Sequence, residues 1–181
     1  IMGNVLPTGL GQNPGRQAML RAGLPVDTGA ITVNKVCGSG LKAVMLAAQA
    51  IACGDADVIV AGGMENMNQA PYYLEKARFG YRMGTAPLID GMIHDGVWDV
   101  ISDFHMGYAA EITTQKFGIS REDMDRFALL SVERALESIK TGRFAKEITP
   151  VSTPQKKGEP VPVGTDETPR LTTREALARL R

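Results

Sequence analysis

The chain has 181 residues, enough for one domain or slightly more, and 44% of them are hydrophobic, so we expect a buried core. Twenty basic residues balance twenty acidic ones, which argues against a nucleic-acid partner, because binding to the phosphate backbone needs clustered positive charge. No uninterrupted apolar run reaches the roughly 20 residues of a membrane span, and the first residues lack the layout of a signal peptide.

The two cysteines, Cys37 and Cys53, are too few for a disulfide framework or a zinc site, and no metal site is expected. If both lie on one helix, their separation corresponds to about 24 Å along the axis, far beyond the reach of a disulfide. We therefore expect two free thiols in a reducing compartment. The cytoplasm is the default, and an organelle matrix is the alternative.

The first third of the chain predicts alternating helices and strands. Pro14 suits the first turn of a short helix that Gly23 ends. A strand is expected at 30–34, a helix at 37–53 and a strand at 57–63, where a continuous apolar run suits burial on both faces. Strand, helix and strand in this order predict a crossover that places two parallel strands in one sheet.

The remaining residues predict an irregular region followed by helices. Periodicity fades over 64–104, and an irregular stretch of this length suits a functional cover or an interface. Ser120 and Asp123 resemble a capping box at the start of a strongly amphipathic helix, and Gly142 suits its end. The other expected elements are a helix at 106–117, a strand at 147–151, a proline-rich loop with a short strand at 153–170, and a helix that begins at 172.

The helix at 37–53 is unusual, because its residues from 43 onward include no charged side chain. A helix that is apolar on all sides belongs in the interior of a protein. Gly38, Ser39 and Gly40 are small enough to let a ligand approach the first turn, where unpaired N–H groups and the positive end of the helix dipole meet. That environment favours a thiolate at Cys37, and it can also receive an oxyanion.

Two interpretations of Cys37 follow from its position alone. It is either a nucleophile with an oxyanion donor beside it, or a small buried core residue, as most cysteines are. We interpret Cys53, at the far end of the same helix, as a core residue only. A cysteine hydrolase is disfavoured, because it needs a histidine near the thiol and the chain has only two histidines.

The segment around Cys37 resembles the active-site signature of the thiolases, the acyl-CoA C-acetyltransferases. In NKVCGSGLKAVMLAAQAI, Asn34 lies three residues before the cysteine, small residues follow it, and an apolar helix runs on. The next segment, GDADVIVAGGMENM, is similar to the strand and turn that follow in this family. Glu65 and Asn66 lie in that turn, and we interpret them as structural.

Three further segments resemble the thiolases in the order that the family has them. GLGQNPGRQAMLRAGLP is similar to a segment near the thiolase dimer contact, and GRFAKEITPV to a later strand. DGMIHDGVWDVISDFHMGYAAE is similar to the loop segment of the short-chain, acetoacetyl-CoA type, with its His-Met-Gly. The resemblance therefore covers essentially the entire chain.

The resemblance implies an α/β fold with the layered α/β/α core and mixed sheet of the thiolases. Residues 1–67 would form part of the N-terminal core domain, which carries the nucleophile in a sheet that lacks its first strands. Residues 68–181 would form the loop or cover domain, with helices and returning strands. The family's acid/base motifs and second catalytic cysteine belong to a C-terminal domain that is absent here, so we interpret the chain as an internal fragment.

The resemblance also implies site residues. Cys37 would carry an acyl group as a thioester, and its own N–H would be one donor of the oxyanion hole. His105, Met106 and Val97 would line the acyl-CoA pocket, and Arg170 would contact CoA. The alternative for Arg170 is a solvated loop charge, and for His105 a helix-start residue satisfied by hydrogen bonds. No cofactor is implied, because coenzyme A is substrate and product.

The implied reaction transfers an acetyl group through a cysteine thioester between two acetyl-CoA molecules, giving acetoacetyl-CoA, or runs backwards as thiolysis. One alternative is a longer-chain 3-ketoacyl-CoA thiolase of fatty-acid β-oxidation, which His-Met-Gly at 105–107 disfavours. The other, for an isolated fragment, is a non-catalytic CoA-binding or dimerisation module. The stretch at 72–84 resembles the loop that pairs thiolase dimers into tetramers, so we expect a dimer or tetramer and no membrane partner.

Overall fold

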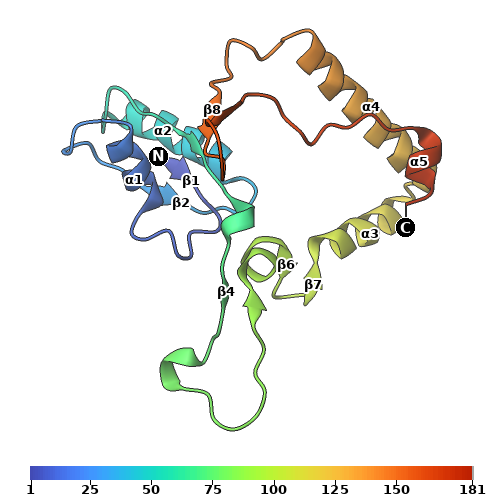
Figure 1. Cartoon of the computed structure of the whole chain (residues 1–181), viewed down its shortest axis with the longest axis horizontal. Helices are drawn as coiled ribbons and strands as arrows, with labels where there is room; N and C mark the ends of the chain where they lie inside the picture. The colour runs from blue at the N-terminus through green and yellow to red at the C-terminus, as the bar shows by residue number, and fades with distance from the viewer. Residues whose placement is uncertain (181) are drawn as a thin grey trace. The chain divides into compact units, whose positions relative to one another are not determined.

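The structure, a computed structural model, describes residues 1–180. The chain divides into two compact units, Ile1–Ala110 and Glu111–Arg181, and the division falls inside helix α3 (Met106–Phe117) (Figure 1). This division differs from the expected boundary between residues 67 and 68. The expected boundary separates a core domain from a loop domain, and it stays a prediction.

A three-stranded parallel sheet organises the first unit. Strand β1 (Met2–Gly3) pairs on one side with β2 (Thr32–Val33) and on the other with β3 (Gly62–Gly63), giving the order β2-β1-β3. The predicted crossover of two parallel strands is confirmed, and β1 lies between them. Strand β1 was not among the strands predicted from the sequence, because two residues carry no periodic pattern that would reveal a strand.

Helix α1 (Pro14–Arg21) begins and ends where the sequence predicts. The side chain of Asn13 caps the helix by accepting a hydrogen bond from the N–H of Arg16 at 3.2 Å. The same oxygen accepts the hydroxyl of Thr32 at 2.7 Å, so the cap also ties the helix to β2.

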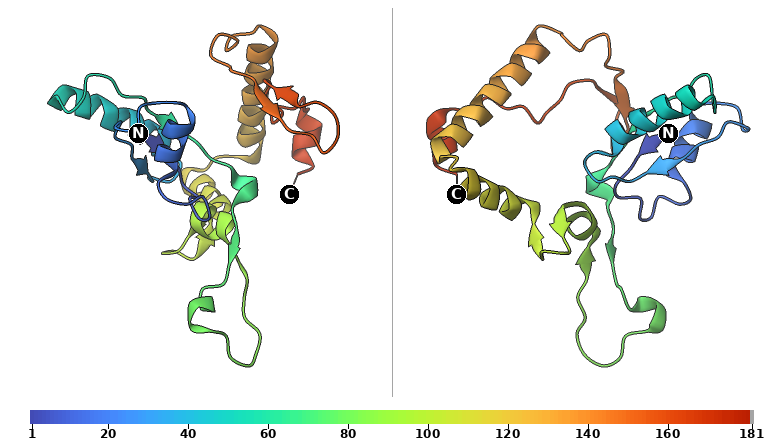
Figure 2. Two further views of the ribbon diagram at one scale, coloured as in Figure 1. Left: turned by 60° about the vertical axis from the view of Figure 1, so that its left-hand side comes forward. Right: turned by 180° about the vertical axis from the view of Figure 1, so that it is seen from behind.

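Helix α2 (Ser39–Cys53) packs on the sheet with one narrow face (Figure 2). Its buried residues, Ser39, Ala43 and Ala47, follow one another at intervals of four and so lie on one side of the helix. The rest is open, and Leu41 is 69% exposed. The prediction of a fully interior helix is therefore wrong for this chain, because strands of two residues cover only one side of α2.

The stretch Val36–Cys53 has the length and composition of a membrane span, with a mean hydropathy of 1.5 over its 18 residues. It includes Lys42, so it is not an uninterrupted apolar run. A single such helix is weak evidence, because core helices of globular proteins meet the same criteria. The contact of its small residues with the parallel sheet favours a core helix.

The strand predicted at 57–63 is reduced to β3, the pair of glycines at its end. Val58 and Val60 are 84% and 68% exposed, so the prediction of a strand buried on both faces is wrong here. The reason is local: β1, the strand paired with β3, begins at Met2, and in residues 1–180 no strand runs beside the residues before β3.

The rest of the first unit is irregular, as predicted, and is held by two short antiparallel hairpins. Strand β4 (Tyr72–Tyr73) pairs with β5 (Ile89–Asp90), and the loop at 74–88 closes this hairpin (green in Figure 1). Strand β6 (Trp98–Asp99) pairs with β7 (Phe104–His105). Three tight helical turns complete this region: η1 (Met67–Gln69), η2 (Ala77–Phe79) and the π-helical turn η3 (Ile93–Val97).

The second unit begins within α3, whose bounds agree with the prediction. Helix α4 (Arg121–Lys140) is capped as predicted by Ser120, which accepts from the N–H of Asp123 at 3.1 Å, and Gly142 follows its end with a φ of 65°. A hairpin and a short helix follow: β8 (Val151–Thr153), β9 (Val161–Val163) and α5 (Arg174–Ala178). The strand predicted at 147–151 begins four residues later than expected.

Candidate active site around Cys37

Cys37 lies in the turn between β2 and α2, two residues before the first helical residue, Ser39. The helix therefore begins later than predicted, and the thiol stands at its entrance. Cys37 is exposed, and its interpretation as a core residue is wrong in this structure. Cys53 is exposed as well, so the same interpretation is wrong for that residue. Both thiols are free, as predicted.

The backbone of the turn is strained immediately before the thiol. Val36 has a φ of 47°, in the left-handed region that a β-branched residue rarely adopts. The side-chain oxygen of Asn34 accepts from the N–H of Val36 at 2.9 Å, which closes a turn of the type that asparagine favours. This conformation carries the chain from the end of the sheet to the solvent-facing Cys37.

Ser39 closes the same turn from the other side. Its hydroxyl accepts from the N–H of Lys35 at 2.9 Å and donates to the carbonyl oxygen of Val36 at 2.6 Å. Only 4% of Ser39 is exposed, so these two bonds satisfy a buried hydroxyl. Hydrogen bonds among the six residues 34–39 thus fix the turn.

Glycines let the start of α2 approach the sheet closely. A Cβ added to Gly3 in β1 would lie 2.6 Å from the carbonyl carbon of Ser39, and one on Gly63 in β3 would lie 3.3 Å from the Cα of Gly40. The helix entrance therefore sits at the carboxyl edge of the parallel sheet, the edge where open α/β folds bind their ligands. The sequence signal for this contact was the run of small residues after Cys37.

The first turn of α2 also holds backbone donors without acceptors. The first hydrogen bond of the helix joins the N–H of Lys42 to the carbonyl oxygen of Gly38 at 2.9 Å. Within residues 1–180, the N–H groups of Gly40 and Leu41 have no hydrogen-bond acceptor, and no side chain caps this helix. Such an end favours negative charge, and it can assist a thiolate or an oxyanion nearby.

A second group of hydrogen bonds, which the sequence did not reveal, lies at the same edge of the sheet. The carboxylate of Glu65, just after β3, accepts from the N–H groups of Val5 and Leu6 and from the side-chain amide of Asn4. Asn4 is 2% exposed, and in the described part of the chain its Oδ1 has no partner. These contacts agree with the structural role predicted for Glu65.

The residues predicted to line the acyl-CoA pocket lie elsewhere in the first unit. Val97 ends η3, His105 ends β7, and Met106 begins α3. The Nδ1 of His105 accepts from the N–H of Gly107 at 2.9 Å, which is the helix-start arrangement that we considered as its alternative. Between these residues and Cys37 the described residues form no hydrogen bond or ring contact, so the pocket assignment stays a prediction.

Arg170 belongs to the second unit, between β9 and α5, and it is exposed. Of the ion pairs found in residues 1–180, none involves Arg170. A CoA contact and a solvated loop charge therefore both remain interpretations of this residue.

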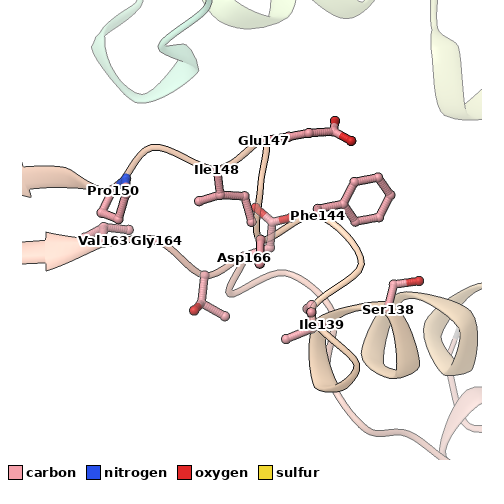
Figure 3. A pocket seen from close by; sticks show the side chains of 12 residues that line it. Ser138, Ile139, Phe144, Glu147, Ile148, Pro150, Val163, Gly164 and Asp166 are labelled. Carbon is pink, nitrogen blue, oxygen red and sulfur yellow. The ribbon is translucent and has the colours of Figure 1, made fainter.

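Neither hollow described in the structure includes a predicted site residue. Figure 3 shows the first, which lies in the second unit between the end of α4 and the β8–β9 hairpin and is lined mainly by apolar residues such as Ile139, Phe144 and Ile148. The second lies beside η3 in the first unit and includes His94 and Trp98. Among residues 1–180, no group of three or more His, Cys, Asp or Glu is arranged to hold a metal ion.

Two titrating groups near η3 are shifted by their surroundings. Burial and the nearby Asp95 carboxylate raise the pKa of Tyr73, whose hydroxyl lies 3.0 Å from the Nδ1 of His94. The pKa of Asp99 is lowered, first by the N–H of Ile101 and then by Ser102, because these donors favour the charged carboxylate. Asp99 thus organises the turn of the β6–β7 hairpin, which ends at His105.

An exposed cysteine at the entrance of a helix, set on the carboxyl edge of a parallel sheet, defines a candidate acyl-transfer site. The model of the thiolase N-terminal domain matches residues 1–181, and the chain belongs to this family. A crystal structure of Acat5 thiolase from Ascaris suum, in complex with coenzyme A, matches 99% of this chain with a TM-score of 0.90 and 36% identity. The predicted thiolase-like α/β fold is thereby confirmed.

Curated relatives agree with this assignment. The chain is 58% identical over 182 residues to an acetyl-CoA acetyltransferase of Pseudomonas aeruginosa, with all of this chain and 46% of the relative covered. It is 56% identical over 167 residues to an acetyl-CoA acetyltransferase of Cupriavidus necator, with 92% of this chain and 42% of the relative covered. The chain thus spans about half the length of the curated relatives that it matches.

Proposed function

We propose that the full-length protein that carries this chain is an acetyl-CoA C-acetyltransferase, which joins two acetyl-CoA molecules into acetoacetyl-CoA and reverses this reaction by thiolysis. The observation that carries the proposal is the exposed Cys37 at the entrance of α2, next to a first turn with unpaired N–H groups. The identity of 58% to an acetyl-CoA acetyltransferase, over the whole chain, supports it.

In the first half-reaction, the Sγ of Cys37 attacks the carbonyl carbon of acetyl-CoA. A bond forms between sulfur and that carbon, the bond from the carbon to the sulfur of CoA breaks, and the CoA thiolate takes up the proton that Cys37 has lost. In the second, another acetyl-CoA loses a proton from the carbon next to its carbonyl, the resulting carbanion attacks the acetyl carbon, and the Cys37 thiolate leaves and takes up that proton. The covalent thioester divides one difficult transfer into two easier ones.

The backbone N–H of Cys37 is assigned as one donor to the oxyanion that forms in each half-reaction. His105, Met106 and Val97 are assigned to the acyl-CoA pocket, and Arg170 to the CoA contact, on the strength of the family resemblance. Within residues 1–180, no acid or base forms a hydrogen bond with Cys37. On the strength of the same resemblance, the proton transfers are assigned to the C-terminal part of the full-length protein.

The alternative function, a thiolase for longer 3-ketoacyl-CoA, differs in the length of the acyl chain that the pocket accepts. We expect the full-length protein to cleave acetoacetyl-CoA faster than 3-ketohexadecanoyl-CoA. The measurement is kcat/KM for thiolysis of both substrates under the same conditions, because this ratio decides between competing substrates. An equal or greater value for the longer substrate would overturn the short-chain assignment.

The stretch at 72–84 is proposed as a self-association surface through which dimers form tetramers. Its side chains include Phe79, which is 89% exposed, and Met83, which is fully exposed, and exposed apolar side chains of this size favour a protein contact. We expect the double variant Phe79→Ser, Met83→Ser of the full-length protein to sediment as a smaller oligomer. An unchanged sedimentation coefficient for a protein that is tetrameric in its natural form would contradict this role.

The cytoplasm is proposed as the compartment, in keeping with two exposed free thiols. Fractionation of the source cells, followed by detection of the protein, tests this assignment. Recovery in an organelle matrix would favour the alternative.

A further inference from the structure

A series of hydrogen bonds connects Glu65 to the turn that carries Cys37. The Oε2 of Glu65 accepts from the N–H of Val5 at 2.6 Å. The carbonyl oxygen of Val5 accepts from the Nδ2 of Asn34 at 3.3 Å, and the Oδ1 of Asn34 accepts from the N–H of Val36 at 2.9 Å. The series thus runs from the segment after β3, across the segment after β1, to the turn after β2.

The carboxylate end of this series is anchored more than once. The Oε1 of Glu65 accepts from the Nδ2 of Asn4 at 2.8 Å and from the N–H of Leu6 at 3.1 Å. Hydrogen bonds to a charged acceptor are shorter and stronger than neutral ones. Val5 and Leu6 follow the end of β1 and have no strand partner in the described part of the chain, so the carboxylate supplies acceptors for their N–H groups.

The same segment also contacts the element that ends at Val97. Leu6 is 7% exposed, and a Cβ on Gly96 in η3 would lie 3.5 Å from its Cδ2, so its side chain packs against this turn. Leu6 is thus also held by its own packing against η3, whereas Val5 is the residue of this segment that contacts the Cys37 turn, through Asn34.

The strained residue in this turn explains why such support matters. A β-branched residue in the left-handed region persists only where its surroundings hold it. Two side chains hold Val36: Ser39, which is part of α2, and Asn34. The amide of Asn34 is itself oriented by the carbonyl of Val5, and therefore by Glu65.

We propose that Glu65 is a positioning residue for Cys37, which acts through Val5 and Asn34 to hold the strained turn and does not touch the substrate. The readout of this proposal rests on the proposed acetyl transfer to Cys37. Loss of the series should misplace the thiol while the CoA contacts stay in place. Acetylation of Cys37 should then slow, whereas the affinity for CoA should not change.

The first test uses Glu65→Gln in the full-length protein. This substitution keeps the volume of the side chain and one oxygen, but its amide NH₂ cannot accept from the N–H of Val5. We expect single-turnover acetylation of Cys37 by acetyl-CoA to slow on the order of 10- to 100-fold, as for a small misplacement of a reacting group. The Kd for CoA should stay unchanged, and Glu133→Gln, which alters an exposed carboxylate on α4, should behave like the natural protein.

The second test uses Asn34→Asp, which keeps the acceptor for the N–H of Val36 and removes the donor to Val5. We expect the same slowing, and no further slowing when it is combined with Glu65→Gln, because both substitutions break one series. Should Glu65→Gln fail to fold, the acetylation rate of Asn34→Asp alone tests the proposal. A folded Glu65→Gln protein with an unchanged acetylation rate, or with CoA affinity lost in parallel, overturns the proposal.

Alkylation by iodoacetamide separates this proposal from the proposed function. Peptide mass spectrometry follows both thiols at once, and Cys53, at the far end of α2, is the internal standard. We expect Glu65→Gln to change the alkylation rate of Cys37 and not that of Cys53. If the natural protein takes up no acetyl group at Cys37, the proposed function fails. The alkylation ratio then still supports or overturns the positioning role of Glu65.

Discussion

Ser39 donates its hydroxyl hydrogen to the carbonyl oxygen of Val36 at 2.6 Å and thereby closes the turn in front of helix α2. The bond joins the first residue of the helix to the strained residue before the thiol. Because the hydroxyl also accepts from the N–H of Lys35, one buried side chain satisfies two backbone groups of the turn. The position of Cys37 therefore depends on a residue that lies behind it in the helix.

Replacing Ser39 by alanine should destabilise the protein. The carbonyl of Val36 and the N–H of Lys35 lose their partner in a buried place, which costs about 1–3 kcal/mol in the free energy of unfolding. Urea denaturation of the full-length protein measures this change. Ser131→Ala, on the exposed face of α4, is the matched control and should change the midpoint little. An equal effect of both substitutions would contradict the role of the Ser39 hydroxyl.

Replacing Gly3 by alanine should force the start of α2 away from the sheet. The added Cβ would lie 2.6 Å from the carbonyl carbon of Ser39, too close for any contact between carbon atoms. We expect a loss of about 1–3 kcal/mol or more, as for overpacking in a core. Gly29→Ala is the control, because nothing lies within 4 Å of its Cβ and its φ is not in the left-handed region. Thermal denaturation of both variants checks the prediction.

The β6–β7 hairpin should loosen in acid. The pKa of Asp99 is below its ordinary value of 3.8 in the folded protein, because backbone N–H groups and Ser102 stabilise the carboxylate. A lowered pKa contributes stability that is complete above the ordinary pKa and is lost as the pH falls through the folded value. The protection factors of the amides at 98–105 against hydrogen exchange should therefore fall over that range. In Asp99→Asn this fall should be absent, and its persistence would point to another group.

The helices could be predicted from sequence because their signals are local. Pro14 marks the start of α1, Ser120 caps α4, and Gly142 follows its end, each within a few residues of the boundary. The bounds of α3 agree with the prediction for the same reason. Helix starts and stops depend on backbone groups near the end of the helix itself.

Strands and burial could not be predicted equally well, because both depend on what lies beside a segment. The apolar run before β3 suits a buried strand, yet in this structure Val58 and Val60 face solvent. From residue 43 onward helix α2 has no charged side chain, yet only the face of its small residues is covered. Hydrophobicity predicts that a residue favours a buried position, whereas the segments packed beside it determine whether it is buried.

In the candidate site, too, only the residue with a local sequence signal could be predicted. Cys37 could be identified because glycines and a serine follow it within the same segment. The support from Glu65 could not, because it joins residues that are 60 apart in sequence, in the segment that follows β1, a strand of two residues. The backbone of Val5 takes part in this support, and no side-chain pattern reports a backbone contact.

In the proposed reaction, the sulfur of Cys37 carries the acetyl group. The most direct test incubates the full-length protein with acetyl-CoA labelled in its acetyl group, digests it under acidic conditions that preserve thioesters, and locates the label by mass spectrometry. We predict stoichiometric label on the peptide that contains Cys37, none on the peptide that contains Cys53, and loss of the label in Cys37→Ser. Label on another residue, or label that survives Cys37→Ser, would contradict the account.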